Sequence, residues 1–227
     1  MKTTGGNEGA KQNAGEAAAS LAEDGMTVGL GTGSTAAHAI RALGQRVGEG
    51  LDIRGIPTSY QSGDLAREAG ISLVTLDDAT PDLAIDGADQ VAGFDLIKGG
   101  GGAHTREKLV DSAAVRFVVV ADPSKEAAVL DRPVPLEILS TARTPVSAAV
   151  RDLGGEPALR AAERKDGPVV TDNGNLILDC EFGRIESPDE LVGDLSRIPG
   201  VLEHGLFVGL ADEIYVGTDK GVEERSR

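Results

Sequence analysis

Cysteine, aromatic residues and long apolar runs are all scarce in this chain of 227 residues. It has one cysteine, Cys180, and no tryptophan, and aromatic residues make up 3% of the sequence. Because a lone cysteine can form neither an internal disulfide nor a structural zinc site, Cys180 is predicted to be a small buried apolar residue. No apolar run of about 18 residues is present, and the N-terminal segment lacks the apolar centre of a signal peptide. These absences predict a cytoplasmic protein without a membrane partner.

Positive charge is scarce as well, with 22 lysines and arginines against 37 aspartates and glutamates and a net charge of -15. A protein of this charge repels the phosphate backbone of nucleic acids, and its few aromatic rings leave little on which bases could stack. Nucleic acid is therefore not an expected partner. The excess of carboxylates, spread along the whole chain, is typical of a halophilic protein. The acidic pair Glu223 and Glu224 is interpreted as a frayed, solvated chain end.

Extended and helical patterns alternate between residues 14 and 122. Strands are expected at 26–30, 52–56, 71–76, 83–86 and 116–122, and helices at 14–22, 34–47, 59–70 and 105–114. A parallel sheet with crossover helices requires such alternation. The last strand is continuously apolar, so it is expected to be buried on both faces. The predicted fold class is α/β, with a Rossmann-like, doubly wound, mostly parallel sheet.

A second, smaller unit is predicted where this alternation ends, at Pro133 and Pro135. The residues that follow have the order β-α-β-β-α-β, which is that of a split βαβ, ferredoxin-like α+β domain. Asn173 and Gly174 predict a hairpin turn within it. The segment 211–218 has the pattern of one more strand of the first sheet. The predicted domains are residues 1–131 with 209–227 for the larger α/β domain, and 132–208 for the small α+β domain.

The stretch GLGTGST, residues 29–35, places three glycines and three hydroxyl side chains between a strand and a helix. Glycines let the backbone approach a ligand, and the helix start offers unpaired N–H groups, with Ser34 or Thr35 as the N-cap. A dinucleotide fingerprint would need glycine at position 34, and an ATP-binding P-loop would need lysine after the last glycine. With NAD and ATP disfavoured, a small phosphate is the favoured ligand. A plain strand-to-helix turn is the alternative.

The stretch DGADQ, residues 86–90, follows a short apolar strand. Ligands of open α/β sheets bind at such strand ends. Asp86 and Asp89, separated by Gly87 and Ala88, would converge around a cationic or hydroxylated group. A magnesium site and an aspartate turn closed by its own hydrogen bonds are the alternatives.

The stretch KGGGGAHTREK, residues 98–108, contains four consecutive glycines, which are costly to order unless the backbone must approach something closely. Thr105 is expected to cap the next helix, and Glu107 then falls in its first turn, where a carboxylate often only complements the helix dipole. Beside this loop and Lys98, however, Glu107 has a catalytic interpretation. A carboxylate near a lysine, sheltered from water, can remove a proton next to a carbonyl and stabilise the resulting oxyanion.

These three stretches, in this order, resemble the type A ribose-5-phosphate isomerases. The resemblance extends to VVVADPSK at 118–125, VVTDNGNLILD at 169–179 and IPGVLEHGLFVG at 198–209, and covers about residues 14 to 219. It implies interconversion of D-ribose 5-phosphate and D-ribulose 5-phosphate through an enediolate, in the pentose phosphate pathway, without a metal or other cofactor. It also implies a homodimer or homotetramer.

The resemblance further implies a role for each matching residue. Glu107 resembles the general acid/base that moves a proton between C2 and C1, and Lys98 the group that stabilises the enediolate. Asp86 resembles the residue that assists ring opening or proton exchange between O1 and O2. Substrate binding is implied for Thr32, Gly33, Ser34, Thr35, Asp86, Gly87, Ala88, Asp89, Lys98, Gly99, Gly100, Gly101 and Lys125.

Two positions depart from the family's usual pattern. Gln90 stands where many members carry glutamate, and His104 where an apolar residue is commoner. His104 is expected to have a packing or surface role and to titrate near pH 6.5 if unperturbed. Neither departure removes a residue to which a chemical role is assigned.

Two other functions remain open. A non-catalytic sugar-phosphate-sensing domain has this kind of fold, but it would normally carry a helix-turn-helix segment, which the short glycine-rich N-terminus cannot supply. An acyl-CoA transferase would use a glutamate as nucleophile, but no CoA-binding region is evident. The combination of Asp86, Asp89, Lys98 and Glu107 favours the isomerase.

Overall fold

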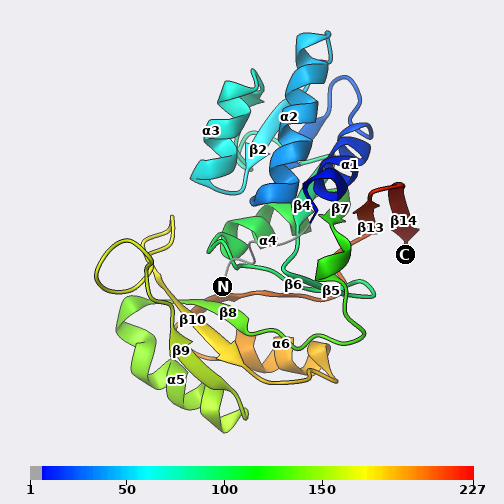
Figure 1. Ribbon diagram of the computed structural model, residues 1–227. Coiled ribbons are helices and arrows are strands. Elements are labelled where there is room, and N and C mark those ends of the chain that lie inside the picture. The colour runs from blue at the N-terminus through cyan, green and yellow to red at the C-terminus, as the bar shows by residue number, and fades with distance from the viewer. Residues whose placement is uncertain (1–6) are drawn as a thin grey trace.

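Helices and strands alternate from the start of the described chain, residues 7–227 of a computed structural model (Figure 1). The first six residues, part of the glycine-rich N-terminus considered above, lie outside the described residues. In chain order the elements are α1 (Glu8–Ala19), β1 (Thr27–Leu30), α2 (Ser34–Gly48), β2 (Arg54–Pro57), α3 (Tyr60–Glu68), β3 (Ser72–Leu73), β4 (Leu83–Gly87), β5 (Gln90–Ala92), β6 (Asp95–Ile97), α4 (His104–Ala113), β7 (Arg116–Ala121), the short 3₁₀-helix η1 (Pro123–Lys125), β8 (Val134–Ile138), η2 (Ser140–Ala142), α5 (Arg143–Asp152), β9 (Glu156–Leu159), β10 (Leu176–Glu181), α6 (Pro188–Ser196), β11 (Val201–His204), β12 (Leu206–Phe207), β13 (Glu213–Thr218) and β14 (Gly221–Ser226).

A seven-stranded sheet has the order β14-β13-β7-β4-β1-β2-β3. Every neighbouring pair is parallel except β13 and β14. The chain therefore winds outward from β1 in one direction to β3 and in the other through β4 to β13. Ligands of open α/β sheets bind beyond the strand ends where the winding direction reverses, here between β1 and β4. The predicted Rossmann-like sheet is confirmed, including the return of residues 213–218 as β13.

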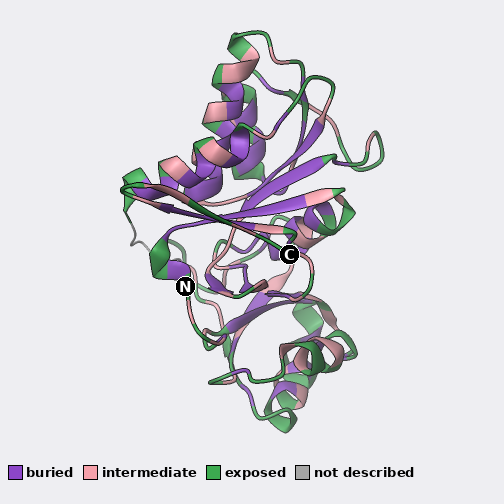
Figure 2. Cartoon of the chain, turned by 90° about the vertical axis from the view of Figure 1, so that its right-hand side faces the viewer, coloured by how far each residue is buried: buried purple, intermediate pink, exposed green. Residues whose placement is uncertain are grey.

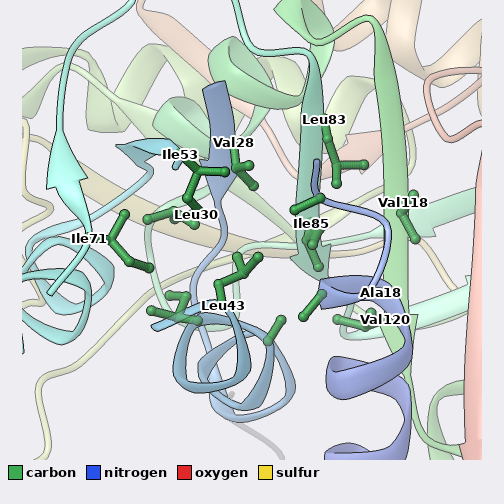
Figure 3. Packing of buried hydrophobic residues seen from close by; sticks show 14 of the residues in the cluster. Ala18, Val28, Leu30, Leu43, Ile53, Ile71, Leu83, Ile85, Val118 and Val120 are labelled. Carbon is green, nitrogen blue, oxygen red and sulfur yellow. The ribbon is translucent and has the colours of Figure 1, made fainter. Parts of the chain in front are cut away.

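The core of this sheet follows from alternation along its strands. Val28 and Leu30 of β1 belong to the apolar cluster on one face of the sheet, together with Leu43 of α2 and with Ala18 of α1, which lies beside Val120 (Figure 3). Phe117, Val119 and Ala121 of β7 belong to a second cluster on the opposite face. The central strands are thus buried on both faces, as expected for 116–122, while the helices expose their outer sides (Figure 2).

A four-stranded antiparallel sheet with the order β11-β8-β10-β9 forms the lower part of Figure 1. With α5 and α6 it confirms the predicted split βαβ, ferredoxin-like arrangement. Gly174 has a φ of +85°, which suits the predicted turn at Asn173 and Gly174. Cys180 is buried in the apolar cluster of this sheet, as predicted, and burial raises the pKa of its thiol to about 12.

Several short strands differ from the sequence prediction. The segment 71–76 forms only the two-residue strand β3. The strands β5, β6 and β12 form a third sheet that was not predicted, and its Val91, Leu96 and Phe207 cover the second face of the main sheet. The interpretation of Glu223 and Glu224 as a frayed end is wrong, because both lie in β14, paired with β13. Their side chains are exposed, since β14 is an edge strand.

Leu43 offers a direct test of the core assignment, because its side chain is completely buried. Leu43→Ala is expected to lower the free energy of unfolding by about 2–5 kcal/mol, since it leaves a cavity between α2 and the sheet. Leu109, on α4, is 57% exposed. The matched control Leu109→Ala is expected to change that free energy by less than about 0.5 kcal/mol. Urea denaturation measures both, and equal losses in the two variants would contradict the assignment.

Candidate active site

Asp86 lies at the carboxyl end of β4 and is fully buried. Since residues alternate along the strand, Ile85 faces α1 and α2 while Asp86 faces the side on which α4 packs. Its Oδ1 accepts hydrogen bonds from the backbone N–H groups of Thr32, at 3.0 Å, and Gly87, at 2.6 Å. This carboxylate therefore joins the ends of β1 and β4.

Lys98, directly after β6, brings a positive charge to this carboxylate. Its side chain is 2% exposed, and its Nζ lies 3.0 Å from Asp86 Oδ2 and 3.6 Å from Glu107 Oε2. Nζ also donates a hydrogen bond to the carbonyl oxygen of Gly87. Burial alone would lower the pKa of Lys98, but the carboxyl groups of Asp86, Glu107 and Asp111 raise it above its ordinary value. The ammonium group therefore remains charged although it is removed from water.

The expectation that Thr105 caps α4 is wrong, because Ala103 occupies the N-cap position and the Thr105 hydroxyl donates to Glu137. Glu107 does lie in the first turn of α4, and only 4% of the residue is exposed. Burial raises the pKa of its carboxyl group to about 8; Lys98 opposes this rise, and the carboxyl groups of Asp86 and Asp89 add to it. No hydrogen-bond donor to Oε2 is found within residues 7–227. A carboxyl group with a pKa near neutrality, one open oxygen and an ammonium group nearby can accept a proton and later return it.

The structure thus brings together Asp86, Lys98 and Glu107, the three residues predicted to carry the chemistry. They come from a strand end, a loop and a helix, and the parallel sheet places all three at one edge. No arrangement of three or more His, Cys, Asp and Glu residues suited to a metal ion occurs in the described chain.

The three glycines of GLGTGST are required for different structural reasons. A Cβ at Gly29 would lie 2.7 Å from Val110 Cγ1 on α4, and one at Gly31 would overlap the Asp86 carboxylate. Both are therefore needed for close packing beneath the site and leave no room for a side chain. Gly33, with a φ of +113°, is needed for the turn into α2.

The expectation that Ser34 or Thr35 caps α2 is wrong. Gly33 occupies the N-cap position, and because glycine has no side chain, α2 has no side-chain cap. Thr32 instead hydrogen-bonds through its hydroxyl to Thr58 and Ser59, at 2.8 and 2.7 Å. Because no side chain caps the helix, its first N–H groups can bind an anion.

The glycine loop that follows Lys98 is held from two sides. The N–H of Gly100 donates a hydrogen bond to Asp89 Oδ2 at 2.6 Å. Arg160 donates from Nη1 to the carbonyl oxygens of Gly99, at 2.8 Å, and Gly100, at 3.3 Å, and is paired with Asp179 on β10. Arg160 was not predicted, because an arginine just after a strand carries no signal of a contact with a distant loop.

Two lysines are buried at the same edge of the sheet. Lys125 is 8% exposed, and its pKa is lowered by burial and by positive neighbours that include Lys11, while Asp89 opposes the shift. Lys11, on α1, is 6% exposed and pairs with Glu8 at 2.7 Å. Lys11 was not predicted, although a lysine on the buried face of an alanine-rich helix is an unusual residue.

The remaining residues predicted to bind substrate lie in the same three loops. The half-buried residues are Thr32, Gly33, Gly87, Ala88, Asp89 and Gly100. Thr35 and Gly99 are buried, and Ser34 and Gly101 are exposed. Hydrogen bonds from Thr32 to Asp86 and from Gly100 to Asp89 join the three loops, while the roles of these residues in binding stay predictions.

Glu137 holds the start of α4 to the small domain. This carboxylate on β8 is fully buried and accepts hydrogen bonds from Thr105 of α4 and from Thr171, Asn173 and Asn175. Burial alone would raise its pKa, but these donors lower it below the ordinary value, so Glu137 is ionised. Glu137 was not predicted, although a carboxylate within the apolar strand VPLEIL was the available signal.

His104 lies beneath the glycine loop and is fully buried. A Cβ at Gly99 would approach its Nδ1 to 2.7 Å, so the ring and the loop are in close contact. Burial lowers the pKa of His104 to about 4, and the cations Lys108 and Arg160 add to this against Glu137. The ring is therefore neutral at physiological pH, and the unperturbed environment that a titration near 6.5 would require is not found. Of the packing and surface roles expected for His104, its complete burial agrees with packing.

The fold and the site together define an α/β enzyme that moves protons next to a carbonyl group. A buried carboxyl group of raised pKa lies beside an ammonium group that can stabilise an oxyanion, near an uncapped helix start suited to a phosphate. These are the requirements of an aldose–ketose isomerase acting on a phosphorylated sugar.

Comparison with known proteins agrees with this class. A family model described as Ribose 5-phosphate isomerase A (phosphoriboisomerase A) matches residues 54–221. Ribose-5-phosphate isomerase A of Natronomonas pharaonis is 68% identical over 225 residues, 99% of this chain and 100% of that protein. The structure of ribose 5-phosphate isomerase A from Methanocaldococcus jannaschii matches with a TM-score of 0.94 and 46% identity, over 97% of this chain and 100% of that one.

A second solved structure is that of a D-ribose-5-phosphate isomerase in complex with phospho-erythronic acid. It matches with a TM-score of 0.93 and 42% identity, over 96% of this chain and 97% of that one. The chain belongs to the ribose 5-phosphate isomerase A family.

Gly101 and Gly100 form a matched pair for testing how closely the loop approaches substrate. A Cβ at Gly101 would meet only Thr32 Cγ2, at 3.8 Å, whereas one at Gly100 would approach Asp89 Oδ1 to 2.7 Å. Gly101→Ala is expected to raise KM while leaving the melting temperature unchanged. Gly100→Ala is expected to lower both the melting temperature and kcat, because Asp89 must move. An unchanged KM in Gly101→Ala would show that this backbone does not contact the substrate.

Glu137→Gln tests the attachment of α4. The amide replaces one acceptor oxygen by a donor facing other donors, so a loss of about 1–3 kcal/mol in unfolding free energy is expected. The misplaced helix start should also lower kcat. Glu156→Gln, at an exposed position on β9, is the control. Urea denaturation measures the stability, and initial rates measure kcat. If Glu137→Gln equals the wild type in both, the positioning role of Glu137 is contradicted.

Proposed function

We propose that this isomerase interconverts D-ribose 5-phosphate and D-ribulose 5-phosphate through an enediolate, with Glu107 as the general acid/base. The observation that carries the proposal is the buried Glu107 carboxyl group, with a pKa raised to about 8, 3.6 Å from the Lys98 ammonium. An ordinary glutamate would be too weak a base for a proton next to a carbonyl, and burial removes part of that difference.

The reaction needs one proton to move between two carbons. In the open-chain aldose, ionised Glu107 takes the proton from C2, and the C–H electrons form the C1–C2 double bond while the carbonyl electrons move to O1. The Lys98 ammonium stabilises the resulting enediolate. Asp86, 3.0 Å from Lys98, is placed to assist ring opening and to pass a proton between O1 and O2. Protonated Glu107 then delivers its proton to C1, which yields the ketose.

Substrate binding follows from the charges around the reacting carbons. The uncapped N-terminus of α2, with Gly33, Ser34 and Thr35, is suited to the phosphate, and Lys125 and Lys11 add positive charge. Asp89 and the backbone of Gly99 to Gly101 are assigned to the sugar hydroxyls. The non-catalytic sensing domain is not favoured, because pure binding has no need for a buried carboxyl group of raised pKa.

Several further features belong to this proposal. The working form is a homodimer or homotetramer in the cytoplasm, without nucleic acid or membrane partners, and the net charge of -15 agrees with the absence of nucleic acid. No helix in the described chain is long and apolar enough to cross a membrane. The domains are 1–131 with 209–227, and 132–208; the separate seven-stranded and four-stranded sheets support this division, although β12 of the second domain pairs with β6 of the first.

The deciding experiment compares the wild type with Glu107→Gln. Ketose formation from ribose 5-phosphate is measured in concentrated KCl with excess EDTA, together with binding of the substrate. The wild type is expected to turn over, and Glu107→Gln is expected to bind substrate with at least a thousandfold lower kcat, on the order of losing an essential general base. Equal turnover by both proteins would refute the role of Glu107. Binding without turnover by the wild type would favour the sensing domain.

The raised pKa of Glu107 also predicts two pH dependences. Because the base must be ionised, kcat/KM should fall about tenfold per unit as pH drops below about 8. The folded pKa lies above the ordinary 4.5, so the folded state binds more protons and stability falls as pH rises from 4.5 to about 8. Glu107→Gln should show a smaller decline in urea denaturation, because the buried Asp111, whose pKa is also raised, still contributes to it. If kcat/KM of the wild type does not change between about pH 6 and about pH 8, the raised pKa of Glu107 is contradicted.

A further inference from the structure

Asp111 is a buried carboxyl group that the proposed reaction does not use. It lies on α4, four residues after Glu107, so both side chains project from the same helix face toward the sheet. Only 2% of the residue is exposed. Neither of its carboxyl oxygens has a hydrogen-bond donor among residues 7–227. A buried carboxylate without any donor is too costly to be the stable form of this group.

The neighbour of Asp111 across the helix–sheet contact is Asp86. Alternation along β4 turns Asp86 toward α4, and Asp111 is within hydrogen-bond reach of it. Asp86 Oδ1 already accepts two backbone hydrogen bonds, while Oδ2 has the ammonium of Lys98 beside it but no hydrogen-bond donor of its own in the described chain. Two carboxylates in contact repel each other, which favours a proton on one of them.

The surroundings decide which of the two holds that proton. Burial raises the pKa of Asp86, but Lys98 and the N–H groups of Gly87 and Thr32 favour its anion and oppose that rise. Asp111 has no comparable donors. Burial, followed by the charge of Asp86, raises the pKa of Asp111 well above its ordinary value; Lys98 opposes this, and Glu107 adds to it. The proton therefore belongs on Asp111.

We propose that Asp111 is a positioning residue whose neutral carboxylic acid donates a hydrogen bond to Asp86 Oδ2. It thereby fixes the second oxygen of a carboxylate whose first oxygen is fixed by Thr32 and Gly87. The inference rests on the proposed function for its catalytic consequence, but the protonation of Asp111 does not depend on it.

This arrangement also limits the negative charge around Lys98. The charged groups that face Asp111 are Asp86 from β4, Lys98 from the loop after β6 and Glu107 from its own helix. With Asp111 neutral, ionised Asp86 and Glu107 oppose one ammonium, for a net charge of -1 among these groups. Ionisation of Asp111 at alkaline pH makes it -2 and weakens the stabilisation of the enediolate. We therefore expect kcat/KM to fall at alkaline pH as Asp111 ionises.

Infrared spectroscopy of protein labelled with ¹³C at the aspartate Cγ tests the proposal directly. A band from a protonated aspartic acid is expected in the wild type at neutral pH. The band should vanish in Asp111→Asn and persist in Glu107→Gln and in Asp78→Asn, whose carboxylate is exposed. Absence of the band in the wild type, or its persistence in Asp111→Asn, would overturn the proposal, and the wild-type measurement needs no variant to fold.

The pH profile provides the catalytic readout. Asp111→Asn keeps a donor to Asp86 without a titrating group, so it should retain kcat within a few-fold of the wild type and lose the alkaline decline. Asp111→Leu removes the donor, and a fall in kcat larger than the change in KM is expected. An alkaline decline unchanged in Asp111→Asn would overturn the role in activity. If the wild type shows the infrared band but neither it nor any variant converts the substrate, the proposed isomerase activity is refuted, whereas the protonation of Asp111 still holds.

Discussion

The buried ammonium group of Lys98 is the interaction on which the site depends. Asp86, Glu107 and Asp111 are all at least 96% buried, and without a positive charge among them there would be little reason for any to ionise. The ammonium lies 3.0 Å from Asp86 and opposes the rise that burial gives to the pKa of that carboxyl group. It lies 3.6 Å from Glu107, whose pKa therefore stays near neutrality instead of rising further. In the proposed reaction the same group stabilises the oxyanion.

The fold supplies this charge at the correct place through backbone contacts. The N–H of Lys98 donates a 2.8 Å hydrogen bond to the carbonyl oxygen of Gly205, and a Cβ at Gly205 would overlap the backbone of Lys98. The residue between β11 and β12 therefore fixes Lys98, while Glu137 fixes the start of α4. Lys98 and Glu107 are thus both held by segments that follow residue 132, although both residues precede it in the chain.

The sequence was sufficient for the features that repeat along the chain. Alternating strands and helices between residues 14 and 122 indicated the parallel sheet, and the order of motifs indicated the family. The strands β5 and β6 were not predicted because three residues are too few to show a period. The glycines of GLGTGST were interpreted as letting the backbone approach a ligand. Gly29 and Gly31 instead make room for Val110 and Asp86, and a sequence does not state which segments will meet. Glu137, Arg160 and Asp111 were missed for the same reason: their partners are distant in the chain or on another element.

The central claim is that one buried carboxylate, beside Lys98, carries the proton from C2 to C1. Conversion of ribose 5-phosphate deuterated at C2, in ordinary water and at low conversion, tests it most directly. The account predicts that part of the deuterium appears at C1 of the ketose and the rest is lost to water, since Glu107 is sheltered but not sealed. Complete retention would indicate hydride transfer, and complete loss would indicate a base in free exchange with solvent; either result would contradict the account.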